Sequence, residues 1–260
     1  MTSKSYLIIF GLIVATAFTS CKKEDESTPP AEADKPVISL NASASGNIID
    51  IPQNALEANN GAFNSVVSNV NQVSAVIAQL NDIPENATTT SRSTNSEVTY
   101  NWTFSNSDGM YEIWYTVNES EIKYDVTYEI SLTVDGELTI PRTEYISGWV
   151  LKNGKDGYLT YNLQIFNTST PNYTFSWDTN LAGDLHVLST WSNTEDSYYT
   201  NIIYETTVYA AGNGETEYKY TSDEDNIVWH YEWNADWSVI TWTYSVNGEV
   251  DEEQSGEWTA

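Results

Sequence analysis

The stretch Ile122–Val134, IKYDVTYEISLTV, alternates apolar and polar side chains without a break. A period of two residues is the pattern of a β-strand that turns one face to a core and the other to water. The dipeptide Asp135-Gly136, which favours a tight hairpin turn, follows directly. The sequence therefore predicts a long strand of an antiparallel sheet, ended by a hairpin.

Turn signals of the same kind recur on both sides of this strand. They are Ser107-Asp108-Gly109, Asn153-Gly154, Gly183-Asp184, Asn213-Gly214, Asn234-Ala235-Asp236 and Asn247-Gly248. Between them the sequence predicts about eleven strands over residues 97–258, all joined by short connections. We therefore expect a mainly β fold, a large antiparallel up-and-down meander. So many strands do not stay flat, so the sheet should curl into a half-barrel or barrel.

One helix is expected before the sheet. Apolar side chains recur every seven residues, with a companion series beside them, and so form one stripe: Leu56, Phe63, Val70 and Ile77, then Val66, Val73 and Leu80. Asn54 and Glu57 fit a capping box, and Asn81-Asp82-Ile83-Pro84 fits a stop. We expect a long amphipathic helix over about residues 55–80, packed on the concave face of the sheet against Tyr124, Tyr128 and Leu132. The Thr/Ser-rich residues 88–96 are expected to connect the two.

Aromatic residues, with 10 Trp and 18 Tyr in 260 residues, gather in three similar segments, Tyr100–Phe104, Tyr173–Trp177 and Trp229–Trp233. Each places three rings on one face of a strand. Such rings form cross-strand ladders that hold a sheet together, or else a platform for a ligand. The candidate ligand contacts are Trp229, Trp233, Trp237 and Trp242.

The N-terminus has the pattern of a signal peptide. Lys4 precedes an uncharged apolar run over residues 6–18, too short to be a permanent membrane span. The run ends at Phe18-Thr19-Ser20-Cys21, which resembles a bacterial lipobox, although Phe18 stands where Leu is usual. The resemblance implies lipidation of Cys21 by diacylglycerol and palmitate; the alternative is a secreted protein with one free thiol.

The following Lys23-Glu24-Asp25 resembles the surface-export signal of Gram-negative outer-membrane lipoproteins; otherwise it is a solvated spacer. We expect a signal peptide at 1–20, a disordered tether at 21–36 and one helix-plus-sheet domain at 37–260. The order of helix and sheet in that domain resembles the half-barrel lipoprotein carriers of the envelope. The implied location is the outer membrane, with the protein anchored through Cys21 and exposed at the cell surface.

The net charge of −27 excludes whole classes of partner. It repels phosphate backbones and anionic lipid head groups, so no nucleic acid is expected. A single cysteine, Cys21, rules out a disulfide framework and a thiolate metal cluster.

Catalytic motifs are missing from the sequence. His186 and His230 are the only histidines, and we expect both to be packing or surface residues, with no metal and no cofactor. Glu232 stands among tryptophans, but strand alternation places it on the face opposite Trp229, Tyr231 and Trp233. The sequence thus favours a non-enzymatic protein that binds a glycan or an envelope protein. The alternative is a carrier of an apolar ligand or lipid between helix and sheet, and a lesser alternative is a glycoside hydrolase with paired carboxylates.

Overall fold

The computed structural model describes residues 61–91, 97–166, 173–193 and 200–259 of the chain. The predicted signal peptide, the tether, Cys21 and Lys23-Glu24-Asp25 lie outside these residues. In the part of the chain that is described, no helix is both long and apolar enough to span a membrane.

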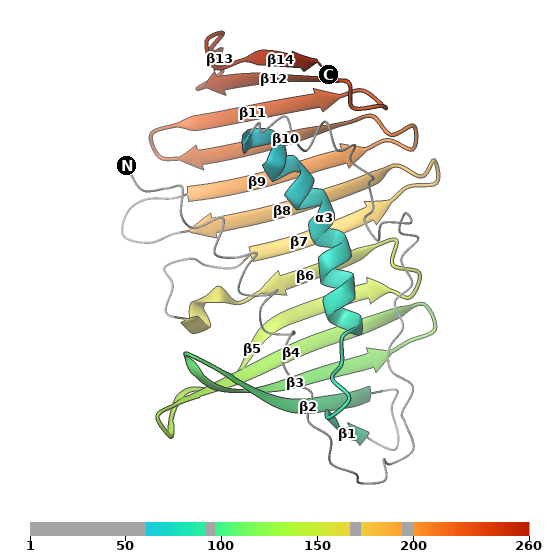
Figure 1. Ribbon diagram of the computed structural model, residues 1–260, viewed down its shortest axis with the longest axis vertical. Helices are drawn as coiled ribbons and strands as arrows, with labels where there is room; N and C mark the ends of the chain where they lie inside the picture. Colours follow the sequence, from blue (N-terminus) through green and yellow to red (C-terminus); the bar gives the residue numbers. More distant parts are fainter. Residues whose placement is uncertain (1–60, 92–96, 167–172, 194–199, 260) are drawn as a thin grey trace.

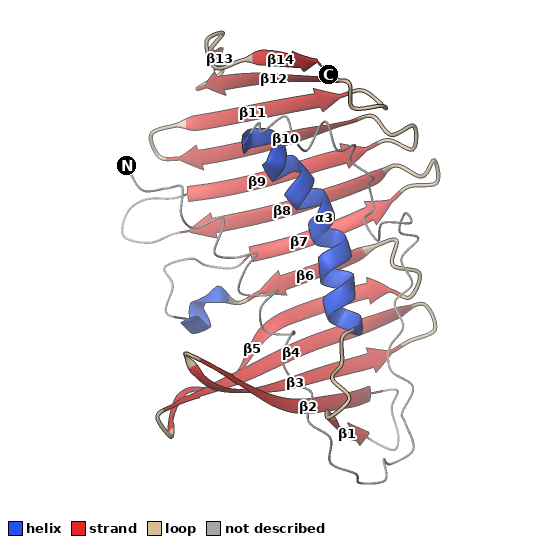
Figure 2. Cartoon of the chain, viewed as in Figure 1, coloured by secondary structure: helices blue, strands red, loops and turns tan. Residues whose placement is uncertain are grey.

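Fourteen strands form one antiparallel sheet, and almost every strand pairs with its neighbours in sequence (Figure 1 and Figure 2). The strands are β1 (Thr88–Ser91), β2 (Glu97–Asn106), β3 (Gly109–Glu119), β4 (Lys123–Val134), β5 (Glu137–Leu151), β6 (Gly157–Tyr161), β7 (Tyr173–Thr179), β8 (Leu185–Asn193), β9 (Thr200–Val208), β10 (Gly214–Ser222), β11 (Asn226–Trp233), β12 (Val239–Val246), β13 (Glu249–Val250) and β14 (Gly256–Thr259). A short 3₁₀ helix, η1 (Leu163–Phe166), follows β6. The predicted antiparallel meander is confirmed.

The structure excludes one of the two expected shapes and corrects one detail of the prediction. The sheet is not a closed barrel: among the described strands, β1 pairs only with β2 at one end, and β13 and β14 pair only with β12 at the other. The stretch from Thr88 to Ser91, expected to be a connection, is the edge strand β1. Its β-branched threonines suit a strand, and Thr89 and Thr90 lie opposite Tyr100 and Thr99 of β2.

Strand β4 is the predicted strand, and its burial alternates with its sequence. Val126, Tyr128 and Ile130 are buried, while the polar residues between them are partly exposed. Asp135 and Gly136 both have positive φ, 51° and 84°. Positive φ at both central residues is the signature of the tight turn that matches the twist of a hairpin.

Strand β5 departs from regular pairing with β4 at three places. The register shifts next to Tyr128, between Ile130 and Leu132, and next to Thr133. Pro141 lies in this irregular stretch. Proline has no N–H to donate to a neighbouring strand and is tolerated where the ladder is interrupted. The bulges therefore allow a fifteen-residue strand to carry a proline.

Helix α3 (Gly61–Asn81) crosses one face of the sheet and contacts β8 and β9 (Figure 2). Its buried side chains share one stripe: Val73, Val76, Ile77 and Leu80. The predicted burial of Val73, Ile77 and Leu80 is confirmed, as is the end of the helix near Asn81. The side chains of Phe63, Val66 and Val70, and the expected start at residue 55, lie outside what the structure describes.

The face that carries α3 is called here the inner face. Two hydrogen bonds join it to the helix: the Gln72 amide donates to the Tyr173 hydroxyl at 2.7 Å, and the Tyr128 hydroxyl donates to the Gln79 carbonyl at 3.3 Å. The rings of Tyr115 and Tyr128 stack with centroids 4.2 Å apart. The Tyr115 hydroxyl is buried and has no hydrogen-bond partner among the described residues. Aromatic ladders across the strands, one of the two predicted roles, are thus present.

Three tryptophans of this face each lie over a glycine on the adjacent strand. The pairs are Gly157–Trp177, Gly214–Trp233 and Gly256–Trp242, and a Cβ added to each glycine would lie 2.3, 2.2 and 2.7 Å from the indole. Each indole N–H donates to a nearby carbonyl, those of Gly154, Gly212 and Gln254, at 2.9, 3.2 and 3.0 Å. The missing side chain of glycine makes room for the ring, so the pair packs as one unit.

Candidate binding surface

The face of the sheet opposite α3, called here the outer face, carries an aligned row of hydroxyl groups. One Ser or Thr from each of β1 to β8 lies in register with the next: Thr90, Thr99, Thr116, Thr127, Ser147, Thr160, Thr174 and Thr190. Two neighbouring pairs of this hydroxyl row are hydrogen-bonded, Thr99 with Thr116 at 2.9 Å and Thr174 with Thr190. At about 4.8 Å per strand the row spans roughly 34 Å.

Two aromatic residues stand beside the hydroxyl row. Trp149 on β5 lies directly opposite Tyr158 on β6, and each is two residues along its strand from a member of the row. Tyr158 is 41% exposed, and Trp149 is partly exposed. Asp125 on β4 faces Trp149 from the other side and pairs with Lys123 at 2.7 Å. We call Trp149 and Tyr158 the aromatic platform.

A third aromatic residue of the outer face has its ring covered. The guanidinium of Arg142 lies 4.5 Å from the ring centroid of Trp114, a cation–π distance. Arg142 also forms an ion pair with Glu129. Trp114 is therefore less available to a ligand than the platform is.

The four tryptophans predicted as ligand contacts all belong to the inner side of the sheet. Trp233 and Trp237 are each 3% exposed and stack on one another with centroids 4.9 Å apart. Trp229 and Trp242 are partly buried and pack against the core. Glu232, as alternation predicted, is exposed on the face opposite buried Tyr231 and Trp233.

The two histidines lie on the outer face in different surroundings. The imidazole of His186 is bracketed: its Nδ1 lies 3.3 Å from Asp178 and its Nε2 lies 3.0 Å from Glu205. The Nε2 of His230 lies 3.4 Å from a carboxylate oxygen of Glu232. Both are partly exposed surface residues, as expected from the sequence.

His230 belongs to a group of three side chains with converging ligand atoms. One nitrogen or oxygen each from Glu215, His230 and Glu232 lies within 4.8 Å of the other two. Glu215 on β10 is directly opposite Glu232 on β11, and His230 is two residues earlier on the same face. Imidazole and carboxylate are ligands that divalent transition ions accept.

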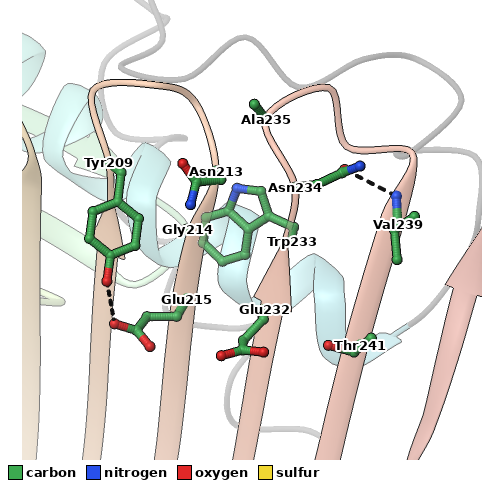
Figure 3. Close-up of a pocket in the computed structure, with 10 residues that line it drawn as sticks. All are labelled: Tyr209, Asn213, Gly214, Glu215, Glu232, Trp233, Asn234, Ala235, Val239 and Thr241. Carbon is green, nitrogen blue, oxygen red and sulfur yellow. Dashed lines mark hydrogen bonds between the residues drawn. The ribbon is translucent and has the colours of Figure 1, made fainter.

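An open depression of about 600 Å³ adjoins this group (Figure 3). Glu215 and Glu232 line it side by side, with Tyr209 and Thr241 on either side. The Tyr209 hydroxyl donates to Glu215 at 2.7 Å, and this bond raises the pKa of the hydroxyl. The loop before β10 is held in turn by the backbone N–H of Ala210, which donates to Asp184 and helps to lower the pKa of that carboxyl.

The chemistry open to the paired carboxylates follows from their exposure. A glycosidase needs one of its two carboxyl groups in apolar surroundings, where it stays protonated. The Glu232 side chain is 63% exposed and points away from the indoles. The arrangement suits the binding of a cation better than proton transfer to a leaving group.

The residues that make the outer face a candidate surface were not predicted from the sequence. Trp149 and Tyr158 each precede a buried residue, Val150 and Leu159, so alternation would have placed both on the polar side. The hydroxyl row depends on the pairing of eight strands, which no single-strand pattern contains.

Comparison with known proteins gives no match: no family model, no curated protein and no solved structure is detectably similar to the chain.

Proposed function

We propose that this chain is a non-enzymatic binding protein that holds a neutral glycan on the outer face of its sheet. The observation that carries the proposal is the aromatic platform beside the hydroxyl row. A sugar ring stacks on an exposed aromatic face, and its hydroxyls exchange hydrogen bonds with Ser and Thr. A row of roughly 34 Å offers contacts along an extended oligosaccharide.

Charge supports a neutral glycan over other polymers. The net charge of −27 repels acidic polysaccharides as it repels nucleic acid. Asp125 and Lys123 beside the platform add one acceptor and one donor of hydrogen bonds.

The inner face supports this reading over that of a lipid carrier. Where the structure describes the helix, its contacts with the sheet are made by the protein's own groups, including the bonds from Gln72 to Tyr173 and from Tyr128 to Gln79. Val73 and Ile77 are 0% and 2% exposed. Over this part of the helix, the protein's own side chains lie where such a carrier would hold its ligand.

The test is binding to an array of neutral oligosaccharides. Trp149→Ala with Tyr158→Ala should abolish binding, whereas Trp149→Phe with Tyr158→Phe, which keeps a ring at each position, should retain most of it. Circular dichroism of each variant checks that the sheet is intact. Unchanged binding by a folded double-alanine variant would overturn the proposal, as would binding lost only with Trp229→Ala and Trp242→Ala.

We further propose that the chain is lipid-anchored at Cys21 in the outer membrane and faces the cell exterior. Cys21→Ala should move the protein from the membrane fraction to the soluble fraction, because the acyl chains then no longer hold it. Alanines at Lys23, Glu24 and Asp25 should leave the anchor intact but reduce labelling of whole cells by an external antibody. Equal labelling would make the charged run a spacer.

A further inference from the structure

We infer that Glu215, His230 and Glu232 form a binding site for a divalent transition-metal ion, with Zn²⁺ as the reference ion. The ligand atoms already converge, each within 4.8 Å of the others. They come from adjacent strands in a fixed register, Glu215 opposite Glu232, so the backbone of the sheet holds the three side chains together.

Electrostatics favours a cation at this position. Like charges directly opposite on neighbouring strands destabilise a sheet, and Glu215 and Glu232 are such a pair. Glu217 lies opposite His230 and adds a third carboxylate nearby, although Lys219 pairs with it. A bound divalent ion would neutralise the two opposed carboxylates and cross-link the side chains of β10 and β11.

The choice of ion follows from the ligands and from the space. A set of one imidazole and two carboxylates suits Zn²⁺ and its neighbours, whereas Mg²⁺ and Ca²⁺ prefer oxygen ligands alone. Three protein ligands leave one position of a tetrahedral site for water. The depression lined by Glu215 and Glu232 supplies the room for that water (Figure 3).

His186 provides a matched control on the same face. It also has two carboxylates near it, but they approach opposite sides of the ring, Asp178 at Nδ1 and Glu205 at Nε2. Such an arrangement brackets the imidazole instead of gathering three atoms about one point. Comparison of variants at the two histidines therefore distinguishes a specific metal site from general attraction of cations to an acidic protein.

The experiment is isothermal titration of the purified, metal-free full chain with Zn²⁺, repeated with Mg²⁺ at equal ionic strength. One Zn²⁺ should bind per chain with a rise in melting temperature, and Mg²⁺ should do neither. His230→Gln and Glu215→Gln should each weaken Zn²⁺ binding by roughly tenfold or more, while His186→Gln should leave it unchanged. Visible absorption of bound Co²⁺ should show a nitrogen ligand in the parent chain and lose that signature in His230→Gln.

Two results would overturn the inference. One is equal Zn²⁺ affinity of the parent chain and a folded His230→Gln variant; the other is binding that Mg²⁺ reproduces or that His186→Gln removes to the same extent. Glycan binding is measured separately on the Trp149 and Tyr158 variants, so failure of either proposal is distinguishable from failure of the other.

Discussion

Single atoms decide several features of this sheet. The Tyr115 hydroxyl is buried without a partner among the described residues, whereas the Tyr173 hydroxyl accepts from Gln72 and donates to Ser189 at 3.3 Å. Burial of a polar group without a hydrogen bond costs free energy, whereas a hydrogen bond that is made contributes about 0.5–1.5 kcal/mol to stability. Two tyrosines of one core therefore contribute to stability with opposite sign at their hydroxyls.

Replacement of these two hydroxyls tests the difference. Tyr115→Phe should leave the free energy of unfolding unchanged or raise it by about 1 kcal/mol, because it removes an unpaired group. Tyr173→Phe, the matched control, should lower it by about 1 kcal/mol, because the partners of the hydroxyl lose a hydrogen bond. Urea unfolding of both variants gives the two values; a loss in Tyr115→Phe as large as that in Tyr173→Phe would mean that its hydroxyl is hydrogen-bonded.

The close packing of a glycine under each of the three tryptophans is a second feature that depends on single residues. Gly157→Ala would place a methyl group 2.3 Å from the Trp177 indole, so the ring must move and its hydrogen bond to the Gly154 carbonyl must lengthen. We expect a loss of about 1–3 kcal/mol in thermal or urea unfolding. In a Trp177→Phe background, where the ring is smaller, the same substitution should cost less; equal cost in both backgrounds would contradict the packing of the pair.

At the scale of elements, the helix and the sheet depend on each other. The described part of α3 buries one stripe and leaves Ala75 and Ala78 exposed, and it contacts β8 and β9 over the middle of the sheet. An isolated helix of this length with several valines is a weak former, so packing on the sheet holds it in place.

Truncation of the stripe measures that packing. Ile77→Ala should lower the free energy of unfolding by about 2–5 kcal/mol, because Ile77 is 2% exposed and its removal leaves a cavity. Ala78→Gln, one position further on the exposed side, should change it by less than about 0.5 kcal/mol. A small effect of Ile77→Ala in chemical unfolding would show that the helix is held by other contacts.

The described part of the chain is one open sheet with helix α3 on its inner face, and this face is rich in buried tyrosine. Burial raises the pKa of Tyr145 and of Tyr173 to about 12, and raises those of Tyr128 and Tyr161 well above the ordinary value. In the unfolded chain these groups ionise near 10. The contribution of these tyrosines to the free energy of unfolding is therefore fully present below about pH 10. It is lost as the pH rises towards and through the pKa values of the folded protein, because the unfolded chain releases its protons first.

Unfolding at alkaline pH tests the combined contribution of these buried tyrosines to stability. The free energy of unfolding in urea should be lower at about pH 11 than at about pH 9, and tyrosinate absorbance should rise late and together with loss of the sheet. Tyr145→Phe should reduce the slope of stability against pH, because one such group is removed. Early, complete ionisation of all tyrosines in the folded protein would contradict the prediction.

The sequence predicted the parts of this molecule that depend on local pattern. The period of two in residues 122–134 and the Asp135-Gly136 turn specified β4 and its hairpin, and the apolar stripe specified the buried side chains Val73 and Ile77 of α3. It did not decide between an open and a closed sheet, because closure depends on accumulated twist and on pairing between the first and last strands. The aromatic platform was not predicted, because Trp149 and Tyr158 lie on different strands and become neighbours only through the register of β5 and β6.

The order of the strands has a consequence for how the chain folds. From β1 to β12 each strand pairs with the one made just before it, so no long loop must close before a pairing forms. Contact order is therefore low for an all-β protein, and low contact order favours fast folding. A chain that is synthesised from its N-terminus can add one strand at a time to the edge of the sheet already formed. Each unpaired strand edge is then covered soon after it appears.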